Sequence, residues 1–375
     1  MGKRLPISTE QIVESILDFY NTNAATVTTD GIRMWSERND YSFPTIRNRL
    51  ADYKSGRGQY SLRRDVQQLE EAYTAPAVEP PSVVSLTPFV DDKFVPFGNF
   101  KDVKQILKSG VFCPIFITGL SGNGKTHSVE QACAQLKREM VRVNITIETD
   151  EDDLIGGFRL VNGDTVWHDG PVVEALKRGA VLLLDEVDLA SNKIMCLQSL
   201  LEGKGVYLKK TNEYVKPTAG FTVVATANTK GKGDDSGMFI GANILNEAFL
   251  ERFAFTFEQD YPTPSVERKI LGRYFCDLLG DAVLKDDTAQ VLTDNLTTWA
   301  EIIRKTYDDG GVDAVITTRR LINIVKAYVI WGDIEKAIEV CTNRFDEDTK
   351  NVFTQLYAKL SAPETTPEER DSIEL

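Results

Sequence analysis

Histidine is scarce in this sequence and its cysteines are scattered, which excludes several kinds of site. The 375 residues include two histidines, His127 and His168, and five cysteines without a Cys-x-x-Cys pair. A zinc cluster needs closely spaced ligands and a disulfide framework usually needs an even number of cysteines, so neither is indicated. We therefore expect free thiols in a reducing compartment, and chemistry that depends on carboxylates, lysine, arginine and backbone groups.

Long apolar runs are also missing from the sequence. No run approaches the roughly 18 residues that a membrane-spanning helix needs. The opening MGKRLPIS has no apolar segment after its charges, and Pro6 stands where a myristoylation signal has Ser or Thr. We expect a cytoplasmic protein without a membrane partner. The net charge of −13 argues against a basic surface throughout, but it is compatible with one local basic face.

Composition divides the chain into five predicted parts. The stretch APAVEPPSVVSLTP carries four prolines and is typical of an extended linker, and the C-terminal APETTPEERDSIEL is acidic and typical of a disordered tail. The predicted parts are a small helical domain (1–74), the linker (75–88), an α/β core (89–260), a helical lid (261–361) and the tail (362–375).

Apolar strand-like runs alternate with amphipathic helical patterns in the core. The runs are CPIFITG, VRVNIT, AVLLLDE, FTVVATAN and FAFTF. Continuous apolar runs separated by helices are typical of a parallel sheet that helices cover on both faces. We therefore predict an α/β fold for this part of the chain.

A phosphate-binding loop follows the first of these runs. GLSGNGKT fits the pattern G-x-x-x-x-G-K-[ST], with a strand before it and a helix after it. Glycines let the backbone N–H groups face phosphate oxygens, Lys125 reaches the β- and γ-phosphates, and the Thr126 hydroxyl can bind Mg²⁺. The predicted nucleotide-binding residues are Gly119, Ser121, Gly122, Asn123, Gly124, Lys125, Thr126 and His127.

Two further strand ends carry polar side chains. Asp185 follows four apolar residues at the carboxyl end of a predicted strand, where we expect it to bind Mg²⁺ with Thr126. The adjacent Glu186 can accept a proton from the attacking water. Asn228 ends the run FTVVATAN, and its amide could position that water, although an Asn at a strand end is also a common turn residue.

The phosphate loop, LLLDE and a strand ending in Asn, in this order, resemble the AAA+ ATPases. The segment Val224 to Phe253 is similar to the ATPase subunit of cobaltochelatase in the MoxR/CobS group, and to CobS-like ATPases of tailed bacteriophages. The resemblance extends over roughly Phe94 to Tyr328. It implies ATP and Mg²⁺ as cofactors, a homo-oligomeric ring of six subunits, and a partner protein with a von Willebrand A domain. For a phage protein the location would be the host cytoplasm.

The resemblance also implies roles for several segments and side chains. The family's helix-2 insert corresponds in position to the segment FRLVNGDTVWHDG. Its pre-sensor hairpin is resembled by the segment LLEGKGVYLKKTNEYVKPTAGF. In the family both of these elements face a central pore. Two ordinary surface hairpins would have much the same sequence. Arg252 in FLERFAFTF matches the arginine finger that completes a neighbouring site; the alternative is a local ion pair with Glu247 or Glu251. Arg319 matches the lid sensor better than Arg320 does.

The N-terminal residues lie outside the resemblance. Residues 9–64 predict three short helices, and Ser42 to Arg64 carries six basic residues against one acidic residue, Asp52. This pattern resembles a helix-turn-helix with a basic wing, in which Arg47, Arg49, Lys54 and Arg57 would contact duplex DNA. The competing interpretation is a domain that docks a protein partner.

Three functions are therefore compatible with the sequence. The first is a DNA-directed ring ATPase, and the second is a chelatase-like or MoxR-like remodeller of proteins. The third is a scaffold that binds ATP and scarcely hydrolyses it, which Glu186, Asn228 and Arg252 together argue against.

Overall fold

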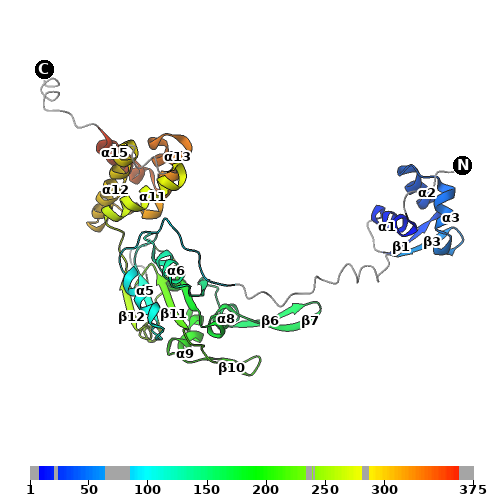
Figure 1. The fold of residues 1–375 in the computed structure, drawn as a ribbon, viewed down its shortest axis with the longest axis horizontal. Coiled ribbons are helices and arrows are strands. Elements are labelled where there is room, and N and C mark those ends of the chain that lie inside the picture. The colour runs from blue at the N-terminus through cyan, green and yellow to red at the C-terminus, as the bar shows by residue number, and fades with distance from the viewer. Residues whose placement is uncertain are drawn as a thin grey trace, which may run out of the picture. The chain divides into compact units, whose positions relative to one another are not determined.

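The computed structural model describes residues 8–20, 24–63, 85–233, 239, 241–280 and 287–362. The chain divides into two units, Met1–Val84 and Ser85–Leu375, and each is considered by itself (Figure 1). Arg64, linker residues 75–84 and tail residues 363–375 lie outside the described residues. Within the described ranges, no helix combines the length and the apolar character that crossing a bilayer requires.

The N-terminal unit combines three helices with a three-stranded antiparallel sheet. Its helices pack through a core that includes Ile16, Trp35 and Ile46. The sheet has the order β1-β3-β2. The elements are α1 (Thr9–Phe19), β1 (Ala24–Thr28), α2 (Thr29–Arg38), α3 (Phe43–Arg49), a 3-10 turn (Ala51–Tyr53), β2 (Lys54–Gly56) and β3 (Gln59–Arg63).

The structure of this unit differs from the three-helix expectation in two respects. Strand β1 was not predicted, and it pairs with β3, which is more than 30 residues away along the chain. The third helix ends at Arg49, and a 3-10 turn and strand β2 follow it. The apolar Leu50 and Tyr60 turn into the core here, so the chain bends into the β2–β3 hairpin.

A five-stranded parallel sheet forms the centre of the second unit and confirms the predicted α/β fold. Its strand order is β12-β4-β11-β8-β5. The strands are β4 (Ile115–Thr118), β5 (Met140–Asn144), β8 (Val181–Asp185), β11 (Thr222–Ala227) and β12 (Phe255–Glu258). Every residue of β4, β8 and β11 is buried, which explains why these strands are continuous apolar runs.

Helices cover both faces of this sheet, because successive side chains of each strand point to opposite faces. Leu183 and Val224 pack with α5 (Phe100–Ser109) and α6 (Lys125–Leu136), whereas Leu182 and Val223 pack with α8 (Pro171–Arg178). Because the strands are parallel, their carboxyl ends lie at one edge of the sheet, the edge at which α6 begins.

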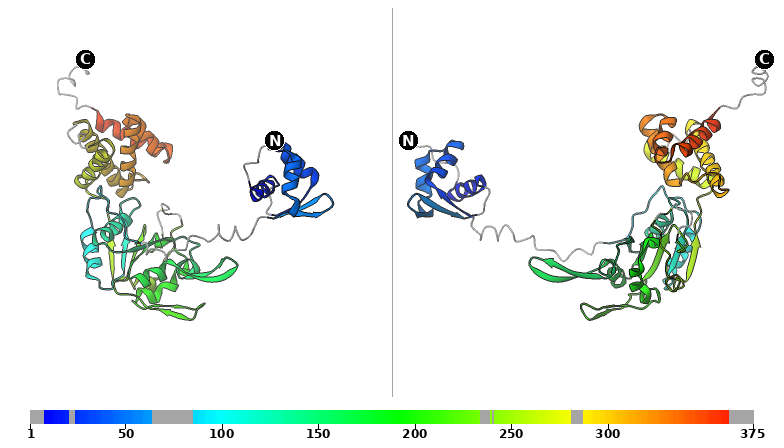
Figure 2. Two further views of the ribbon diagram at one scale, coloured as in Figure 1. Left: turned by 45° about the vertical axis from the view of Figure 1, so that its right-hand side comes forward. Right: turned by 180° about the vertical axis from the view of Figure 1, so that it is seen from behind.

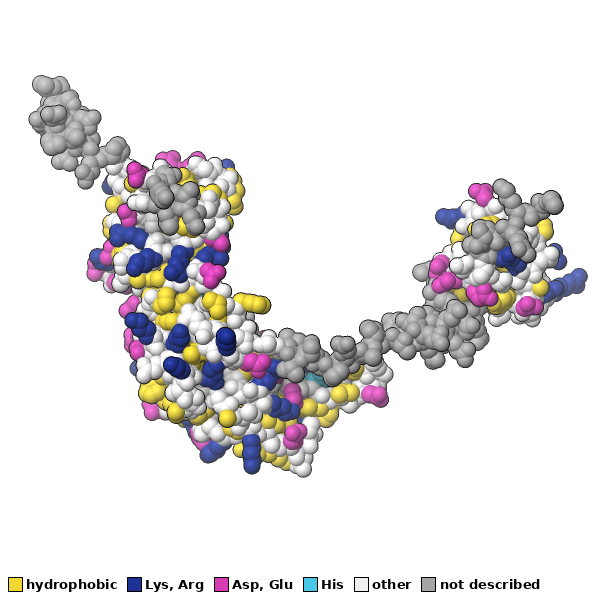
Figure 3. Space-filling view, viewed as in Figure 1, with side chains coloured by type: hydrophobic (Ala, Val, Ile, Leu, Met, Phe, Trp, Pro, Cys, Tyr) yellow, Lys and Arg dark blue, Asp and Glu magenta, His cyan; other side chains and the backbone are white. Residues whose placement is uncertain are grey.

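Two hairpins extend from the same side of the core (Figures 1 and 2). The insert hairpin, β6 (Gly156–Val161) and β7 (Asp164–Asp169), follows the short helix α7 (Glu151–Leu154). The pre-sensor hairpin, β9 (Val206–Leu208) and β10 (Glu213–Val215), follows α9 (Gln198–Leu201). Apolar side chains are exposed on both hairpins (Figure 3); they are Phe158, Leu160, Val161, Val166, Tyr207 and Tyr214.

The C-terminal helices form the lid, which packs around Trp299. They are α11 (Pro264–Leu279), α12 (Asp287–Asp308), α13 (Thr318–Trp331), α14 (Ile334–Thr342) and α15 (Glu347–Ser361). The indole of Trp299 donates a 2.8 Å hydrogen bond to the carbonyl of Phe353. A buried ion pair between Glu267 and Arg304 joins α11 to α12 and lies beside the start of α13. A short helix in the core, α10 (Glu247–Leu250), precedes β12.

Candidate active site

The phosphate loop lies between the buried strand β4 and the first turn of α6. Gly119, Gly122 and Gly124 have φ angles of 146°, 72° and 89°, which side-chain-bearing residues rarely adopt. A Cβ atom at Gly119 would lie 2.2 Å from the carbonyl oxygen of Gln259, and one at Gly122 would lie 2.9 Å from Thr317 of the lid. The loop therefore requires glycine both for its backbone angles and for its close approach to neighbouring segments.

Lys125 is the first residue of α6, and its ammonium group turns back onto the loop. Its Nζ donates hydrogen bonds to the carbonyls of Gly119 (2.6 Å) and Leu120 (2.9 Å) and to Oδ1 of Asn228 (3.3 Å). Burial lowers the pKa of Lys125 to about 8, although nearby Asp188 and Asp185 favour the charged form. Lys125 and Asn228 line the same cavity.

Asp185, at the end of β8, lies next to the Thr126 hydroxyl. Thr126 donates to Oδ1 of Asp185 across 2.8 Å, and the Thr226 hydroxyl donates to the same oxygen. A carboxylate and a hydroxyl side by side are hard oxygen donors of the kind that Mg²⁺ prefers. The donor set that the sequence suggested for magnesium therefore fits that ion.

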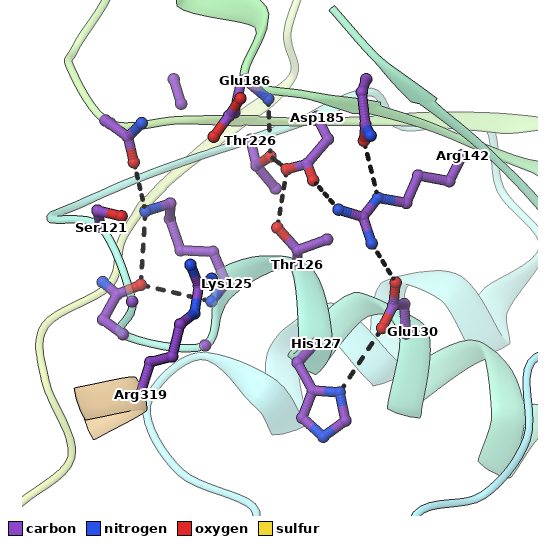
Figure 4. A pocket seen from close by; sticks show the side chains of 16 residues that line it. Ser121, Lys125, Thr126, His127, Glu130, Arg142, Asp185, Glu186, Thr226 and Arg319 are labelled. Carbon is purple, nitrogen blue, oxygen red and sulfur yellow. Dashed lines mark hydrogen bonds and ion pairs between the residues drawn. The ribbon is translucent and has the colours of Figure 1, made fainter. Parts of the chain in front are cut away.

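Glu186 occupies a left-handed backbone position directly after the strand. Its φ of 58° is unusual for a residue with a side chain, and its backbone N–H donates to the Thr226 hydroxyl across 3.4 Å. The side chain is exposed and borders the cavity beside Thr226 (Figure 4). The Glu186 side chain therefore does not share the position of the Asp185 side chain, which lies against Thr126.

Asp188 is a buried carboxylate that the sequence interpretation missed. Its Oδ2 accepts hydrogen bonds from the backbone N–H groups of Asn228 and Thr229, both at 2.9 Å, and from the Thr229 hydroxyl at 3.1 Å. These bonds fix the strand end that carries Asn228. Asp188 is the third acidic residue in the run DEVD, and this was the one sequence feature that could have pointed to it. Its hydrogen-bond partner Asn228, however, lies 40 residues away along the chain.

Arg142 and Glu130 are two further charged residues that line the cavity and were not predicted. Arg142 belongs to β5 and bonds to Asp185, while Glu130 belongs to α6 and bonds to Arg142. In Figure 4 the Arg142 guanidinium lies between the side chains of Asp185 and Glu130. The run VRVNIT contains the arginine, but nothing in that run shows that β5 is the neighbour of β8.

The lid brings Arg319 to the same cavity, which has a volume of about 340 Å³. The backbone N–H of Arg319 donates to the carbonyl of Gly122 across 3.4 Å, and its side chain points toward Lys125 (Figure 4). Arg320 instead donates to the carbonyl of Cys341 and lies 5.0 Å from the Phe345 ring centroid. Of these two arginines, Arg319 is the one that lines this cavity.

A second cavity, of about 270 Å³, continues from the phosphate loop into the contact between core and lid. His127 lines both cavities and lies 3.2 Å from Oδ2 of Asp91. Six apolar or aromatic side chains line this second cavity; they are Phe94, Val95, Phe97, Ile270, Tyr274 and Ile322.

Arg252 does not line either cavity of its own chain. Its Nε donates to Glu202 across 3.0 Å, and Nη1 donates to the carbonyl of Ala248. The side chain is 27% exposed. The local partner is thus Glu202 of the preceding segment, and neither Glu247 nor Glu251 takes that place.

Comparison with known proteins shows which domain family part of the chain matches. Residues 114–253 match the model of the AAA domain (dynein-related subfamily). The chain is 27% identical over 252 residues to the aerobic cobaltochelatase subunit CobS of Sinorhizobium sp., covering 65% of this chain and 74% of that protein. It is 32% identical over 162 residues to NorQ of Paracoccus denitrificans (strain Pd 1222), covering 43% and 57% of the two chains.

Midasin of Giardia intestinalis is 30% identical over 164 residues, which are 43% of this chain and 3% of that protein. Among solved structures, the Holliday junction branch migration motor RuvB of Thermotoga maritima is 16% identical, with 74% of this chain and 86% of that chain covered and a TM-score of 0.38.

The parallel sheet, the phosphate loop and the matching domain define an AAA+ protein, a class whose general activity is ATP hydrolysis. Within that class, the chain is similar to the MoxR/CobS-like ATPases.

Proposed function

We propose that this protein is a Mg²⁺-dependent ring ATPase that uses hydrolysis to remodel or move a macromolecular partner. The observation that carries the proposal is the meeting of Lys125, Asp185, Glu186 and Asn228 at one cavity that the lid residue Arg319 also borders. These side chains come from the ends of three different elements, so only the folded chain assembles them.

In this proposal, the phosphate loop binds the phosphates of ATP, and the metal donors bind Mg²⁺. Backbone N–H groups of Gly122 to Lys125 and the start of α6 attract phosphate oxygens, and Lys125 exchanges its loop carbonyls for the β- and γ-phosphates. Thr126 and Asp185 would hold Mg²⁺, which when bound neutralises phosphate charge. The apolar wall around Phe97 and Tyr274 suits a flat base beside the loop.

Glu186 and Asn228 account for the hydrolytic step. Glu186 borders the cavity without binding the metal donors, so its carboxylate accepts the proton of the attacking water. Asn228 orients that water, because an amide can both donate and accept. Arg319 contacts the γ-phosphate from the lid, so loss of that phosphate changes how the lid sits on the loop.

Arg252 supplies the argument for a ring. It lies away from the cavity of its own chain and is partly exposed, so it can act at the site of a neighbouring copy. Six copies are expected from the resemblance to the MoxR/CobS group. The exposed apolar side chains of the insert and pre-sensor hairpins would then contact the partner that is moved.

The N-terminal unit would deliver the ring to duplex DNA. Its three helices precede a β2–β3 hairpin, and Arg47 of α3 and Lys54 and Arg57 of the hairpin are exposed, while Arg49 is half-buried. Figure 3 shows Lys and Arg side chains at the edge of this unit where α3 and the hairpin lie. A short helix beside a basic hairpin is an arrangement that suits a DNA groove and its flanking phosphates.

The similarity to CobS and NorQ favours a second candidate function. In this alternative the ring remodels a protein together with a partner that contains a von Willebrand A domain, and the N-terminal unit docks protein. The exposed Phe158 and Tyr207 on the hairpins suit a polypeptide as well as a nucleic acid.

Phosphate release from ATP tests the proposal, measured with Mg²⁺ or with a chelator, with and without duplex DNA, and at two salt concentrations. We expect metal-dependent turnover that DNA stimulates, with less stimulation at higher salt. A full-length variant with Arg47, Lys54 and Arg57 changed to Ala should lose the stimulation. A control with the exposed Lys101, Lys108 and Lys269 changed to Ala should keep it. Turnover that ignores DNA would favour the protein remodeller, and no turnover would favour a nucleotide-binding scaffold.

A further inference from the structure

Arg142 projects from the outermost strand of the core sheet onto the carboxylate proposed to bind magnesium. Strand β5 pairs with β8 so that Asn144 stands opposite Asp185 and Arg142 opposite Leu183. Because side chains two residues apart share a face, Arg142 and Asn144 both lie on the face of Asp185. The Arg142 guanidinium bonds to Asp185 at 2.5 Å, to Glu130 at 2.9 Å and to Asn144 at 3.1 Å (Figure 4).

These bonds leave Asp185 with both oxygens engaged. Thr126 and Thr226 donate to Oδ1, and Arg142 donates to Oδ2. The side chain of Asp185 is 9% exposed, whereas that of Arg142 is 42% exposed. The arginine therefore neutralises a nearly buried carboxylate from the open side of the cavity, the side from which a cation would enter.

We propose that Arg142 is a positioning residue that keeps divalent cations from binding Asp185 until a nucleotide supplies phosphate charge. This inference rests on the proposed metal site of Thr126 and Asp185. A divalent cation next to Asp185 is repelled by the guanidinium, and it competes with the guanidinium for the carboxylate. The phosphates of a nucleotide offset that repulsion, so metal and nucleotide bind together more favourably than either does alone.

The three partners of Arg142 are arranged for this task. A planar guanidinium donates in fixed directions, so Glu130 and Asn144 hold it aimed at Asp185 although the side chain is partly exposed. Because the side chain is exposed, the core does not depend on it for packing. A purely structural ion pair would affect stability and leave the metal affinity of the nucleotide-free protein unchanged.

Binding of Mn²⁺ to the nucleotide-free, full-length protein tests the inference, with free Mn²⁺ measured by electron paramagnetic resonance. We expect Arg142→Gln to bind Mn²⁺ roughly tenfold more tightly than the unaltered protein, since one nearby positive charge is removed. Asp185→Asn in the Arg142→Gln background should abolish the gain. Saturating ADP should reduce the difference in Mn²⁺ affinity between Arg142→Gln and the unaltered protein. Arg159→Gln, on the exposed insert hairpin, is the matched control and should bind Mn²⁺ as the unaltered protein does.

Two further variants separate charge from geometry. Arg142→Lys keeps the charge, so its Mn²⁺ affinity should rise less than that of Arg142→Gln. Asn144→Ala removes one hydrogen bond that holds the arginine in place, so its Mn²⁺ affinity should rise slightly. If Arg142→Gln does not fold, the Asn144→Ala and Arg142→Lys results decide. Unchanged Mn²⁺ affinity in the folded variants would overturn the inference, as would a gain that survives Asp185→Asn. The measurement needs neither hydrolysis nor a ring, so absent ATP turnover would count against the proposed function alone.

Discussion

Arg252 and Glu202 form an ion pair at the surface of the core, with Nε of the arginine 3.0 Å from Oε1 of the carboxylate. Glu202 also accepts a hydrogen bond from Lys204 at 2.7 Å, and these two cations lower the pKa of its carboxyl group, Lys204 contributing first. Ion pairs at a solvent-exposed surface contribute little to stability. The isolated subunit thus holds the Arg252 side chain weakly. In the proposed ring, this side chain can leave Glu202 and bind at the site of a neighbouring subunit with little loss of stability.

Changing Arg252→Ala should reduce ATP hydrolysis by about 10³-fold or more while nucleotide binding is kept, because an arginine finger acts mainly on the transition state. Steady-state phosphate release and equilibrium binding of a fluorescent ADP analogue measure the two quantities. Glu202→Gln frees the arginine and should retain hydrolysis. A normally assembled Arg252→Ala protein with nearly full turnover would show that Arg252 is not a finger.

Mixing two inactive variants tests whether Arg252 acts on a neighbouring copy. Glu186→Gln should lower turnover by about 10²- to 10⁴-fold by removing the general base, yet bind ATP and stabilise the ring. When Glu186→Gln and Arg252→Ala subunits are combined, some interfaces pair an intact Glu186 with an intact Arg252, and activity should return in part. If both residues act within one chain, every mixture stays inactive.

Gly122→Ala should weaken nucleotide binding, and Gly110→Ala should not. Both glycines have positive φ angles, 72° and 69°, so either substitution costs about 1–2 kcal/mol of backbone strain. A Cβ atom at Gly122 would lie 2.9 Å from Thr317 of the lid, whereas one at Gly110 meets nothing within 4 Å. Thermal melts should show a similar loss of stability for the two variants. Calorimetric titration should show weaker ADP binding for Gly122→Ala than for Gly110→Ala. Equal ADP affinities would contradict the proposed close contact of loop and lid.

The buried carboxylate of Glu267 should be essential to the lid. It receives two hydrogen bonds from Arg304, at 2.8 and 2.9 Å, and one from the Thr318 hydroxyl at 2.6 Å, and it is 1% exposed. Glu267→Ala leaves the arginine without its partner and should cost about 3–5 kcal/mol in the free energy of unfolding.

The exposed pair of Arg268 and Asp294 provides the control for this prediction. Its atoms are 2.5 Å apart, but both side chains are open to solvent, so Asp294→Ala should cost less than about 1 kcal/mol. Chemical denaturation gives both values. Similar losses for the two variants would mean that burial of Glu267 does not set its contribution.

Much of the α/β fold could be predicted from local patterns. The strands β4, β8 and β11 are continuous apolar runs because they are buried on both faces, and the phosphate loop is recognisable because backbone geometry restricts it to glycine at fixed positions. Each of these features depends on residues that are close together along the chain. The N-terminal strand β1 was missed, since its five residues pair with β3 and form no distinct pattern alone.

The sequence by itself therefore determined the loop, the Asp185 and Glu186 pair at a strand end, and the hairpin-like inserts, all of which are local consequences of residue type and spacing. Only the tertiary structure decided that Arg142 reaches Asp185 and that Asp188 holds the Asn228 strand end. It also placed Arg319, and not Arg320, at the cavity that Lys125 and Asp185 line. It also decided that Arg252 meets Glu202. These contacts join segments that are distant in sequence, and sheet order and helix rotation set them through the packing of the whole unit.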